Sequence, residues 1–421
     1  MGSELWSPLP GMSDIAWPEV SLWQKVEDVT RRIMSLYGFR EIRTPILERT
    51  TVFIRAIGEG TDVVQKEMFT FEDRGGRAVA LRPEGTAGVM RALCATGQDL
   101  AGSRVYYMGP MFRAERPQAG RRRQFHQIGA ESLGPASPHA DAECMALMSH
   151  LLAACGVDRA KIRIHTRGAM ADAPQVREAL VSNLRAVAPT LCSDCQRRLE
   201  LHPLRILDCK QPGCRRVVES LPPLTDWMSA ASREYFEATC NLLETLGVPF
   251  EIDRHLVRGL DYYEHTIWEA VHPALGAQDA VAGGGRYRIQ FGDRTIEGVG
   301  FAVGVERLLL AMQGESVSAD ERGGAPKVWL VAVGPDALRA NLVVVQRWRQ
   351  AGVPCGMDVT GRSVKGQMRL ADRSGARWVL VRGEEELQAG TFRCKDMTSG
   401  QERTMAVEEI ERKLLSFGTL E

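Results

Sequence analysis

The sequence lacks the features that mark a membrane or secreted protein. None of its apolar runs reaches the roughly 18 residues that suggest a membrane-spanning helix. The first residues, MGSELWSPLPGMSD, contain neither the basic nor the apolar region of a signal peptide. Net charge is also lacking, since Lys plus Arg and Asp plus Glu both number 53. We therefore expect a cytoplasmic protein without membrane contact. The balanced charge of the whole chain says nothing for or against a polyanionic partner.

Cysteine is too scattered to form the disulfide framework of a secreted protein. The 421 residues include ten cysteines, several of them in apolar or helical contexts, such as Cys94, Cys144, Cys155 and Cys240. This usage favours thiols that are mostly reduced and buried. The length itself exceeds what one hydrophobic core usually organises, so we expect two or three domains.

The pattern of expected helices and strands divides the chain into four parts. An apolar period typical of a helix spans residues 19–37, and uneven alternation of strands and helices continues to residue 313, which predicts an α+β body. A helical stretch at about 167–224 interrupts this body as an insertion. The polar, glycine-rich residues 314–326 indicate a linker. Strands and helices then alternate through residues 327–421, as in a small α/β domain.

The last of these parts has a local excess of basic residues. Between residues 339 and 382 nine basic residues stand against only Asp358 and Asp372. An excess of seven suits a phosphate backbone, although two ordinary solvated helices explain it about equally well. The nine are Arg339, Arg347, Arg349, Arg362, Lys365, Arg369, Arg373, Arg377 and Arg382.

The most informative stretch runs from Arg104 to Glu131 and reads RVYYMGPMFRAERPQAGRRRQFHQIGAE. It predicts two antiparallel strands joined by a loop that contains proline, glycine and several arginines. Because side chains alternate along a strand, one face of the hairpin collects residues too polar for a core. These are Arg113 and Glu115 on the first arm, and Arg123, Phe125, Gln127 and Glu131 on the second.

This polar face is typical of a nucleotide-binding hairpin. Guanidinium groups bind phosphates through paired hydrogen bonds, and the loop from Arg116 to Arg122 brings several of them together. Phe125 would stack on a base, and Glu115 would accept its amino group. The structural alternative is a solvated edge hairpin with a run of charge.

Four further motifs accompany the hairpin, and together they resemble the histidyl-tRNA synthetase family of class II aminoacyl-tRNA synthetases, bacterial type. TPILE around Pro45, the hairpin, and GVGFAVGVERLLLAM from Gly298 resemble the three motifs of the class. LRPEGTAG from Leu81 and LVRGLDYYEHTIWE from Leu256 resemble elements particular to the histidine enzymes. In addition to these four, DVTGRSVKGQMRLAD resembles a segment of their anticodon-binding domain.

The resemblance implies a fold, an activity and partners. The fold is an antiparallel-sheet catalytic domain over residues 1–313, with a helical insertion, followed by an α/β anticodon-binding domain. The activity is formation of histidyl-adenylate from L-histidine and ATP, with Mg²⁺ bridging the phosphates, and transfer of histidine to tRNA(His). The Pro45 motif implies a homodimer.

The chemistry brings a carboxylate to a phosphate, so the site must supply positive charge and alignment. The resemblance implies three catalytic arginines, Arg113, Arg258 and Arg307. The residues implied to bind ATP are Arg113, Glu115, Arg121, Arg123, Phe125 and Arg307. The acceptor end of the tRNA is expected at Arg116, Gln118 and Arg122. The structural alternative for Arg258 is a loop arginine in a salt bridge, and that for Arg307 is an ordinary arginine on the surface of a helix.

Histidine recognition is expected from carboxylates and hydroxyls. A neutral imidazole offers one donor and one acceptor, so a carboxylate and a tyrosine hydroxyl are a suitable pair. Glu84, exposed by its flanking Pro83 and Gly85, would bind the ammonium group. The full expected set is Glu84, Gly85, Thr86, Arg113, Gln127, Glu131, Arg258, Tyr262 and Tyr263.

Several segments depart from the family pattern. The family's GGRYDGL is replaced by Gly284, Gly285, Arg286 and Tyr287 followed by RIQ, which predicts a reshaped loop near the histidine site. PGMSD from Pro10 and HTRGAMAD from His165 also differ from the residues usual in the family at these segments. None of these changes removes a candidate arginine.

A cysteine cluster within the insertion has an open interpretation. Cys192 and Cys195 form C-x2-C, and Cys209 and Cys214 follow at a spacing compatible with tetrahedral zinc. The C-x4-C half is irregular, and the resemblance includes relatives with similar cysteines that need no metal. We therefore include no metal ligand among the predicted site residues.

Two rival functions share the implied fold. A non-catalytic histidine-binding regulatory subunit is the first, and fold alone does not separate it from an enzyme. Against it stand the three arginines and the expected domain after Lys327. The second is a synthetase for another amino acid, and LVRGLDYY argues against it.

Overall fold

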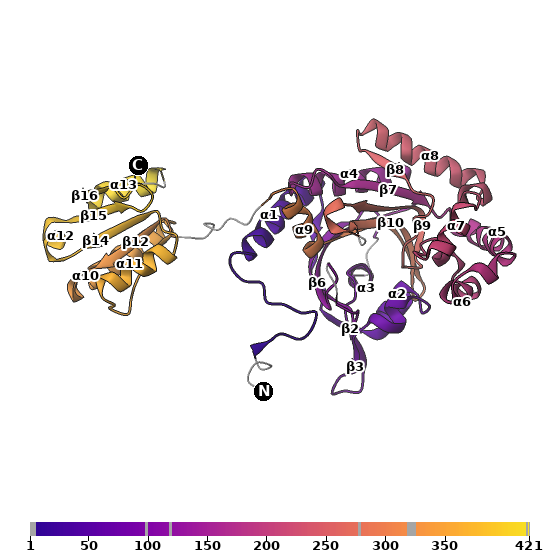
Figure 1. The fold of residues 1–421 in the computed structure, drawn as a ribbon, viewed down its shortest axis with the longest axis horizontal. Coiled ribbons are helices and arrows are strands. Elements are labelled where there is room, and N and C mark those ends of the chain that lie inside the picture. Colours follow the sequence, from indigo (N-terminus) through magenta and orange to yellow (C-terminus); the bar gives the residue numbers. More distant parts are fainter. Residues whose placement is uncertain are drawn as a thin grey trace. The chain divides into compact units, whose positions relative to one another are not determined.

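The chain divides into two compact units, residues 1–319 and 320–421, which are described separately. The computed structural model describes residues 6–96, 100–117, 120–276, 279–317, 326–417 and 420. None of the helices in these ranges is long and apolar enough to cross a membrane. Figure 1 labels the elements of both units.

The first unit is an α+β domain. Its helices are α1 (Val20–Leu36), α2 (Thr50–Ile57), α3 (Thr86–Ala95), α4 (Pro138–Ala154), α5 (Ala173–Arg185), α6 (Ser193–Leu201), α7 (Pro212–Glu219), α8 (Ala230–Thr245) and α9 (Val305–Gly314). Its strands are β1 (Arg40–Glu41), β2 (Leu47–Arg49), β3 (Thr70–Glu72), β4 (Ala78–Leu81), β5 (Arg104–Phe112), β6 (Gln124–Leu133), β7 (Lys161–Thr166), β8 (Phe250–Ile252), β9 (Tyr263–Val271), β10 (Ala280–Phe291) and β11 (Arg294–Gly304).

An eight-stranded sheet is the centre of this unit. Its strand order is β1-β5-β6-β11-β10-β9-β7-β8, and its interior pairs are antiparallel. Only the edge strands β1 and β8 pair in parallel with their neighbours. A smaller sheet, β2-β4-β3, is not hydrogen-bonded to it as part of one sheet. The predicted hairpin is β5 and β6, with Val105 opposite Glu131 and Gly109 opposite Gln127.

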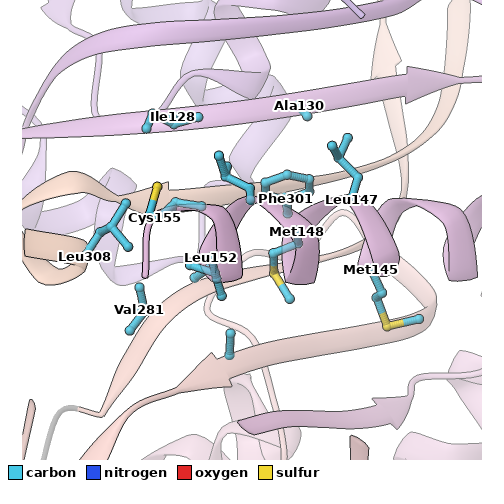
Figure 2. Close-up of a cluster of buried hydrophobic side chains, with 14 of the residues drawn as sticks. Ile128, Ala130, Met145, Leu147, Met148, Leu152, Cys155, Val281, Phe301 and Leu308 are labelled. Carbon is cyan, nitrogen blue, oxygen red and sulfur yellow. The ribbon is translucent and has the colours of Figure 1, made fainter. Parts of the chain in front are cut away.

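Helix α4 forms the main core against one face of the sheet. Met145, Met148 and Leu152 are fully buried or nearly so, and Figure 2 shows them with Phe301 and Ile128 of the sheet. Helix α1 joins the same core through its buried apolar stripe, which confirms the helix expected at residues 19–37. Apolar burial of this kind is the dominant favourable contribution to folding. The other face of the sheet carries a second apolar cluster, which includes Met111, Ile267 and Ile296, and polar side chains such as Glu131 lie beside it.

A buried ion pair joins strand β10 to helix α4. Arg286 is 1% exposed, and its Nε and Nη2 donate to Asp141 Oδ1 over 2.8 and 2.7 Å. The other carboxylate oxygen, Asp141 Oδ2, accepts from the Tyr235 hydroxyl at 3.0 Å. Nη1 of Arg286 reaches the carbonyls of Gly134 and Pro135. Every charged oxygen and most guanidinium donors thus have partners, as buried charges require.

The insertion forms a helical lobe of its own. Helices α5, α6 and α7 lie together beside β9 (Figure 1), and their side chains enclose a small separate apolar cluster. This lobe core includes Leu180, Leu184, Ile206 and the thiols of Cys195 and Cys214. The ten cysteines are all free in the structure, and six of them are buried, which confirms the expectation of mostly buried thiols.

The second unit is a five-stranded α/β domain. Strands β12 (Val328–Ala332), β13 (Cys355–Met357) and β14 (Trp378–Arg382) pair in parallel. Strands β15 (Thr391–Asp396) and β16 (Glu402–Ala406) continue the sheet antiparallel. The helices are α10 (Pro335–Gln350), α11 (Val364–Arg373), α12 (Glu384–Ala389) and α13 (Val407–Phe417). The run VWLVAV contributes β12, a mostly buried strand between β13 and β14, as its continuous apolar character predicts.

Eight of the nine basic residues expected to form a basic surface on this unit are exposed, and one is buried. Arg382 is only 7% exposed, and its guanidinium lies 4.8 Å from the centre of the Phe392 ring. It stabilises the core of the unit through a cation–π contact and has no access to a phosphate. The other eight basic residues are exposed.

Breaking the Arg286–Asp141 pair should destabilise the first unit strongly. Asp141→Asn leaves a buried guanidinium without its counter-charge, which typically costs about 3–5 kcal/mol. Urea unfolding followed by circular dichroism measures the change. The matched control is Glu27→Gln, which removes one partner of the exposed i,i+4 pair with Arg31 and should cost about 0.3–0.5 kcal/mol. Equal shifts for the two variants would contradict the role given to the buried pair.

Candidate active site

The polar face of the large sheet contains a pocket built from several elements. Residues from the hairpin, from the loop before β9, from β10 and β11, and from the start of α3 converge on it. Its lining residues are Glu84, Thr86, Tyr107, Arg113, Gln127, Glu131, Arg258, Leu260, Tyr262, Tyr263, Gly283, Tyr287, Gly300, Phe301 and Ala302. Eight residues expected from the sequence to bind histidine are among them. Gly85, the ninth, lies directly beneath the ring of Tyr107.

Glu131 lies at the base of the pocket and is 1% exposed. Its Oε1 accepts the Thr86 hydroxyl at 2.7 Å, and its Oε2 has no hydrogen-bond partner among the described residues. Burial raises the pKa of this carboxyl to about 8, although the bond from Thr86 opposes the shift. Strand β11 passes at this point with Gly300 opposite Glu131, and a Cβ on Gly300 would lie 2.0 Å from Oε2. Only glycine leaves room for the carboxylate.

Glu84 is buried, so the expectation that it is exposed is wrong. It is 4% exposed, and its two oxygens accept the backbone N–H groups of Thr86 and Ala87 at 2.7 and 2.8 Å. These N–H groups belong to the first turn of α3 and have no partner within the helix. Capping by Glu84 therefore holds this carboxylate and Thr86 in fixed positions beside the pocket.

Aromatic rings enclose the pocket and limit its width. The ring of Tyr107 lies against the backbone of Gly85 and Gly129, where any Cβ would approach it to 2.2 and 2.1 Å. The rings of Tyr262 and Tyr263 are 4.7 Å apart, and both side chains are 7% exposed. Burial raises the pKa of both hydroxyls. They stay protonated at neutral pH and are available as donors as well as acceptors.

Arg113 enters the pocket from the hairpin. Strand β5 ends at Phe112, so Arg113, Glu115 and Arg123 lie just outside the strands that were expected to include them. The Arg113 Nε donates to the Pro83 carbonyl at 3.0 Å, and its guanidinium lies 5.3 Å from the centre of the Phe125 ring. The carbonyl fixes one edge of the guanidinium, and Nη1 forms an ion pair of 3.9 Å with Glu115, while the side chain still lines the pocket.

Arg258 approaches from the loop before β9. It pairs with Glu269 of β9, and its guanidinium covers Gly283, where a Cβ would approach it to 2.6 Å. Burial alone would lower the pKa of Arg258, but the Glu269 carboxylate raises it overall. Its Nε is buried and has no partner among the described residues. The charge is therefore held firmly in place while one donor stays unused.

Arg307 lies outside the lining of this pocket. It follows β11 at the start of α9, and its Nε and Nη1 donate to the carbonyls of Gly120 and Ala280 at 3.0 and 2.6 Å. It thus connects the hairpin loop to strand β10. Burial, and to a lesser extent the nearby Arg121, lowers the pKa of Arg307.

The hairpin loop is organised by contacts with carboxylates and with the N-terminal segment. Arg121 donates to Glu115 at 2.8 Å, which places these two expected ATP-binding residues together. Arg122 donates to the Ser13 hydroxyl, and the Gly11 carbonyl accepts the backbone N–H of Arg123 at 2.8 Å. Arg116 is exposed. Gln118 lies outside the described residues.

The altered segment after Gly285 is part of a strand, so the expectation of a reshaped loop is wrong. Residues 288–290 continue β10 and pair with 295–297 of β11. Arg288 forms an ion pair of 2.8 Å with Glu297. A long β-hairpin therefore replaces the loop that the sequence comparison indicated.

Several pocket residues were missed from the sequence. Tyr107 is six positions before Arg113 along the same arm, so strand alternation would have placed it on the polar face. The motif GVGFAVG has small residues at every second position, Gly298, Gly300, Ala302 and Gly304, a signal of a face that must leave space. Tyr287 and Leu260 carry no comparable signal.

Three polar atoms of the pocket lining have no hydrogen-bond partner among the residues that the structure describes and are available to a polar ligand. Glu131 Oε2, Gln127 Oε1 and Arg258 Nε are buried and have no partner in the described structure. Buried polar groups are nearly always hydrogen-bonded, and each unpaired one costs about 1–3 kcal/mol. A ligand with an acceptor near Arg258 and donors near Gln127 and Glu131 would satisfy all three.

Comparison with known proteins agrees with this arrangement. A family model described as Histidyl-tRNA synthetase matches residues 11–308, and one described as Anticodon binding domain matches residues 327–417. The chain is 43% identical to a histidine–tRNA ligase of Syntrophotalea carbinolica over 414 residues, 97% of this chain and 98% of that protein. It is also 43% identical to that of Geobacillus kaustophilus, over 95% and 96% of the two chains.

A solved structure extends the likeness to three dimensions. The crystal structure of apo Staphylococcus aureus histidyl-tRNA synthetase matches with a TM-score of 0.80 and 34% identity, and covers 97% of this chain and 99% of that one. The catalytic unit and the anticodon-binding unit described above are both included in these matches. The chain therefore belongs to the histidyl-tRNA synthetase family.

Proposed function

We propose that the pocket activates L-histidine with ATP, as the first step of a histidine–tRNA ligase reaction. The histidine carboxylate attacks the α-phosphate of ATP, an O–P bond forms, and the bond to the β-phosphate breaks to release diphosphate. The histidyl group then passes from AMP to the 3′ end of tRNA(His). The observation that carries the proposal is the set of unsatisfied atoms between Arg258 at one end of the pocket and Glu131 at the other.

The arginines would supply charge and alignment. The attacking carboxylate and the phosphate are both anions, so cations that are already in place lower the barrier without reorganising. We assign Arg113 and Arg258 to opposite sides of the α-phosphate, because both line the pocket and are fixed by Pro83 and Glu269 respectively. Arg307 is assigned to the outer phosphates, because it is next to the hairpin loop.

The remaining hairpin residues would bind the rest of ATP. We assign the base to Phe125, on which it would stack in place of the Arg113 contact, and to Glu115. Arg121 and Arg123 would hold the phosphates. ATP would enter as its magnesium complex, because Mg²⁺ binds phosphate oxygens and neutralises their charge.

The acidic end of the pocket would recognise histidine. Glu84 would accept the ammonium group, since each of its oxygens keeps a lone pair beyond those used for capping α3. Glu131 and Gln127 would bind the imidazole with Tyr262 or Tyr263. A pocket that pairs every polar group of its substrate rejects analogues lacking them by about 10⁴–10⁵.

Charge and exposure indicate where macromolecules would bind. We assign the acceptor end of tRNA(His) to the hairpin loop with Arg116, Gln118 and Arg122, and its anticodon to the basic surface of the second unit. A second copy of the chain would cover the β2-β4-β3 sheet. There Leu47 and Phe71 are 41% and 48% exposed on one face, as a homodimer interface would require.

The experiment that tests the function is amino-acid-dependent exchange of diphosphate into ATP, without tRNA. Each of the twenty amino acids is supplied in turn with ATP and Mg²⁺. We expect exchange with histidine alone. Folded protein that binds histidine but supports no exchange would favour the regulatory alternative, and exchange with another amino acid would overturn the assignment of substrate.

Removing Arg258 should separate binding from chemistry. Arg258→Ala should lower histidine-dependent exchange by about 100- to 1,000-fold, because one preorganised donor to a developing oxyanion is lost. Histidine binding, measured by calorimetry, should remain detectable. The control is Arg254→Ala, an exposed arginine four residues earlier, which should exchange like the unchanged protein. Near-normal exchange by Arg258→Ala would remove this residue from catalysis.

Histidine binding should release a proton from Glu131. The raised pKa of about 8 means that this carboxyl is mostly protonated at pH 7 in the free protein. An imidazole N–H prefers the carboxylate, so binding between pH 7 and 8 should expel up to about one proton, and affinity should rise up to about tenfold per pH unit below pH 8. Calorimetry in buffers of different ionisation enthalpy measures the proton.

The control for this measurement is Glu131→Gln, which cannot ionise at the same position. Histidine itself gains or loses the same protons with either protein. The difference between the two proteins in protons released is therefore due to Glu131. Equal proton release by the two proteins would contradict the assignment.

A further inference from the structure

We propose that the helical lobe contains a structural zinc site, in which four cysteine thiolates bind one Zn²⁺ ion. The four ligands are Cys192, Cys195, Cys209 and Cys214. They belong to the lobe core and take no part in the pocket. Each thiol would lose its proton to solvent on binding, so the closed site would carry two negative charges.

The four sulfur atoms are already gathered at the size of such a site. All lie within 4.8 Å of one another, and the Sγ atoms of Cys192 and Cys209 are 3.9 Å apart. Zinc–sulfur bonds of about 2.3 Å in a tetrahedron place the sulfurs about 3.8 Å apart. A disulfide needs about 2.0 Å, so the geometry suits ligands of a common ion better than a covalent pair.

The backbone around the cluster favours thiolates. Cys192 immediately precedes α6, and Cys214 lies in the first turn of α7, where helix dipoles stabilise negative charge. The N–H of Cys192 also donates to the Cys214 Sγ at 3.2 Å. These features compensate for the charge of four thiolates around a divalent ion.

The lobe has a physical need for a cross-link. Its own core consists of eleven buried residues, and two of these are the cysteines Cys195 and Cys214 themselves. Small bodies with little core commonly depend on a metal or disulfides. A zinc ion would tie α6 and α7 together at the point where their N-terminal ends meet.

The same cross-link would reach the pocket through the chain between the second and third ligands. Arg205, in this segment, forms an ion pair of 3.1 Å with Asp62, and the ring of His202 lies against Gly60. The Arg205 guanidinium also faces Gly259, next to Arg258, at 3.6 Å from the position of a Cβ. Val257 packs against the lobe core. Zinc would thus hold the support on which Arg258 rests.

Metal content and cobalt substitution test the site directly. Full-length protein without a polyhistidine tag is purified from zinc-supplemented medium, and elemental analysis should find about one zinc per chain. Protein stripped under reducing conditions and reloaded with Co²⁺ should give the intense visible bands of tetrahedral cobalt and the near-ultraviolet charge-transfer band of cobalt thiolates.

A matched pair of double variants assigns the metal to these cysteines. Cys192→Ser with Cys209→Ser should lose the zinc and the cobalt spectrum. Cys94→Ser with Cys240→Ser, which changes two equally half-buried thiols elsewhere, should keep both. In the metal-free protein, trypsin should cleave within the lobe, and exchange activity should fall with it.

Two results would overturn the proposal. One is fully reduced, folded protein, with ten titratable thiols after denaturation, that binds neither zinc nor cobalt in thiolate coordination. The other is zinc-free protein with four thiols fewer, which would show disulfides in the lobe. If the first double variant fails to fold, the cobalt spectrum of the unchanged protein still decides. A zinc-loaded protein without exchange activity would count against the proposed function only.

Discussion

The pocket depends on one tight constraint, the burial of the Glu131 carboxylate where strands β6 and β11 pair. The carboxylate is enclosed by Thr86 on one side and by the bare backbone of Gly300 on the other. Any side chain at residue 300 would collide with it, and loss of the Thr86 hydroxyl would leave a second oxygen unpaired. The chain accepts the cost of an almost dry carboxyl because a ligand can later satisfy it. Glycine in this strand therefore serves the site and weakens the strand only locally.

The two arginines of the pocket are held in a different way from Glu131. Arg113 donates to a carbonyl through Nε and pairs with Glu115 through Nη1, whereas Arg258 pairs with a carboxylate and has a buried Nε without a partner among the described residues. Partners of this kind restrict rotation of the guanidinium, so less ordering entropy is lost when an anion binds. The two charges come from elements far apart in the sequence, the hairpin and the loop before β9. The eight-stranded sheet is what brings them within one pocket.

Much of this arrangement could be predicted from the sequence, because strand alternation and short motifs depend only on neighbouring residues. Alternation correctly grouped Phe125, Gln127 and Glu131, and the apolar run VWLVAV correctly indicated a buried parallel strand. Burial and capping could not be predicted. Glu84 seemed exposed between proline and glycine, yet it caps α3, and Arg382 counted as a surface charge although Phe392 covers it. Both errors concern contacts with residues distant in sequence or with backbone groups, which a residue pattern does not encode.

Arg258 lies between the large sheet and the inserted lobe. Glu269 fixes its charge from within the sheet, while Val257 and Gly259 on either side of it contact the inserted lobe. A loop held at its centre by an ion pair and at its flanks by packing has little freedom to move the guanidinium. Two reacting anions must be aligned to well within about 1 Å. In the proposed function the stiffness of this loop would therefore matter as much as the charge of Arg258. In the proposed function the insertion would therefore influence the position of Arg258, although it contributes no residue to the pocket lining.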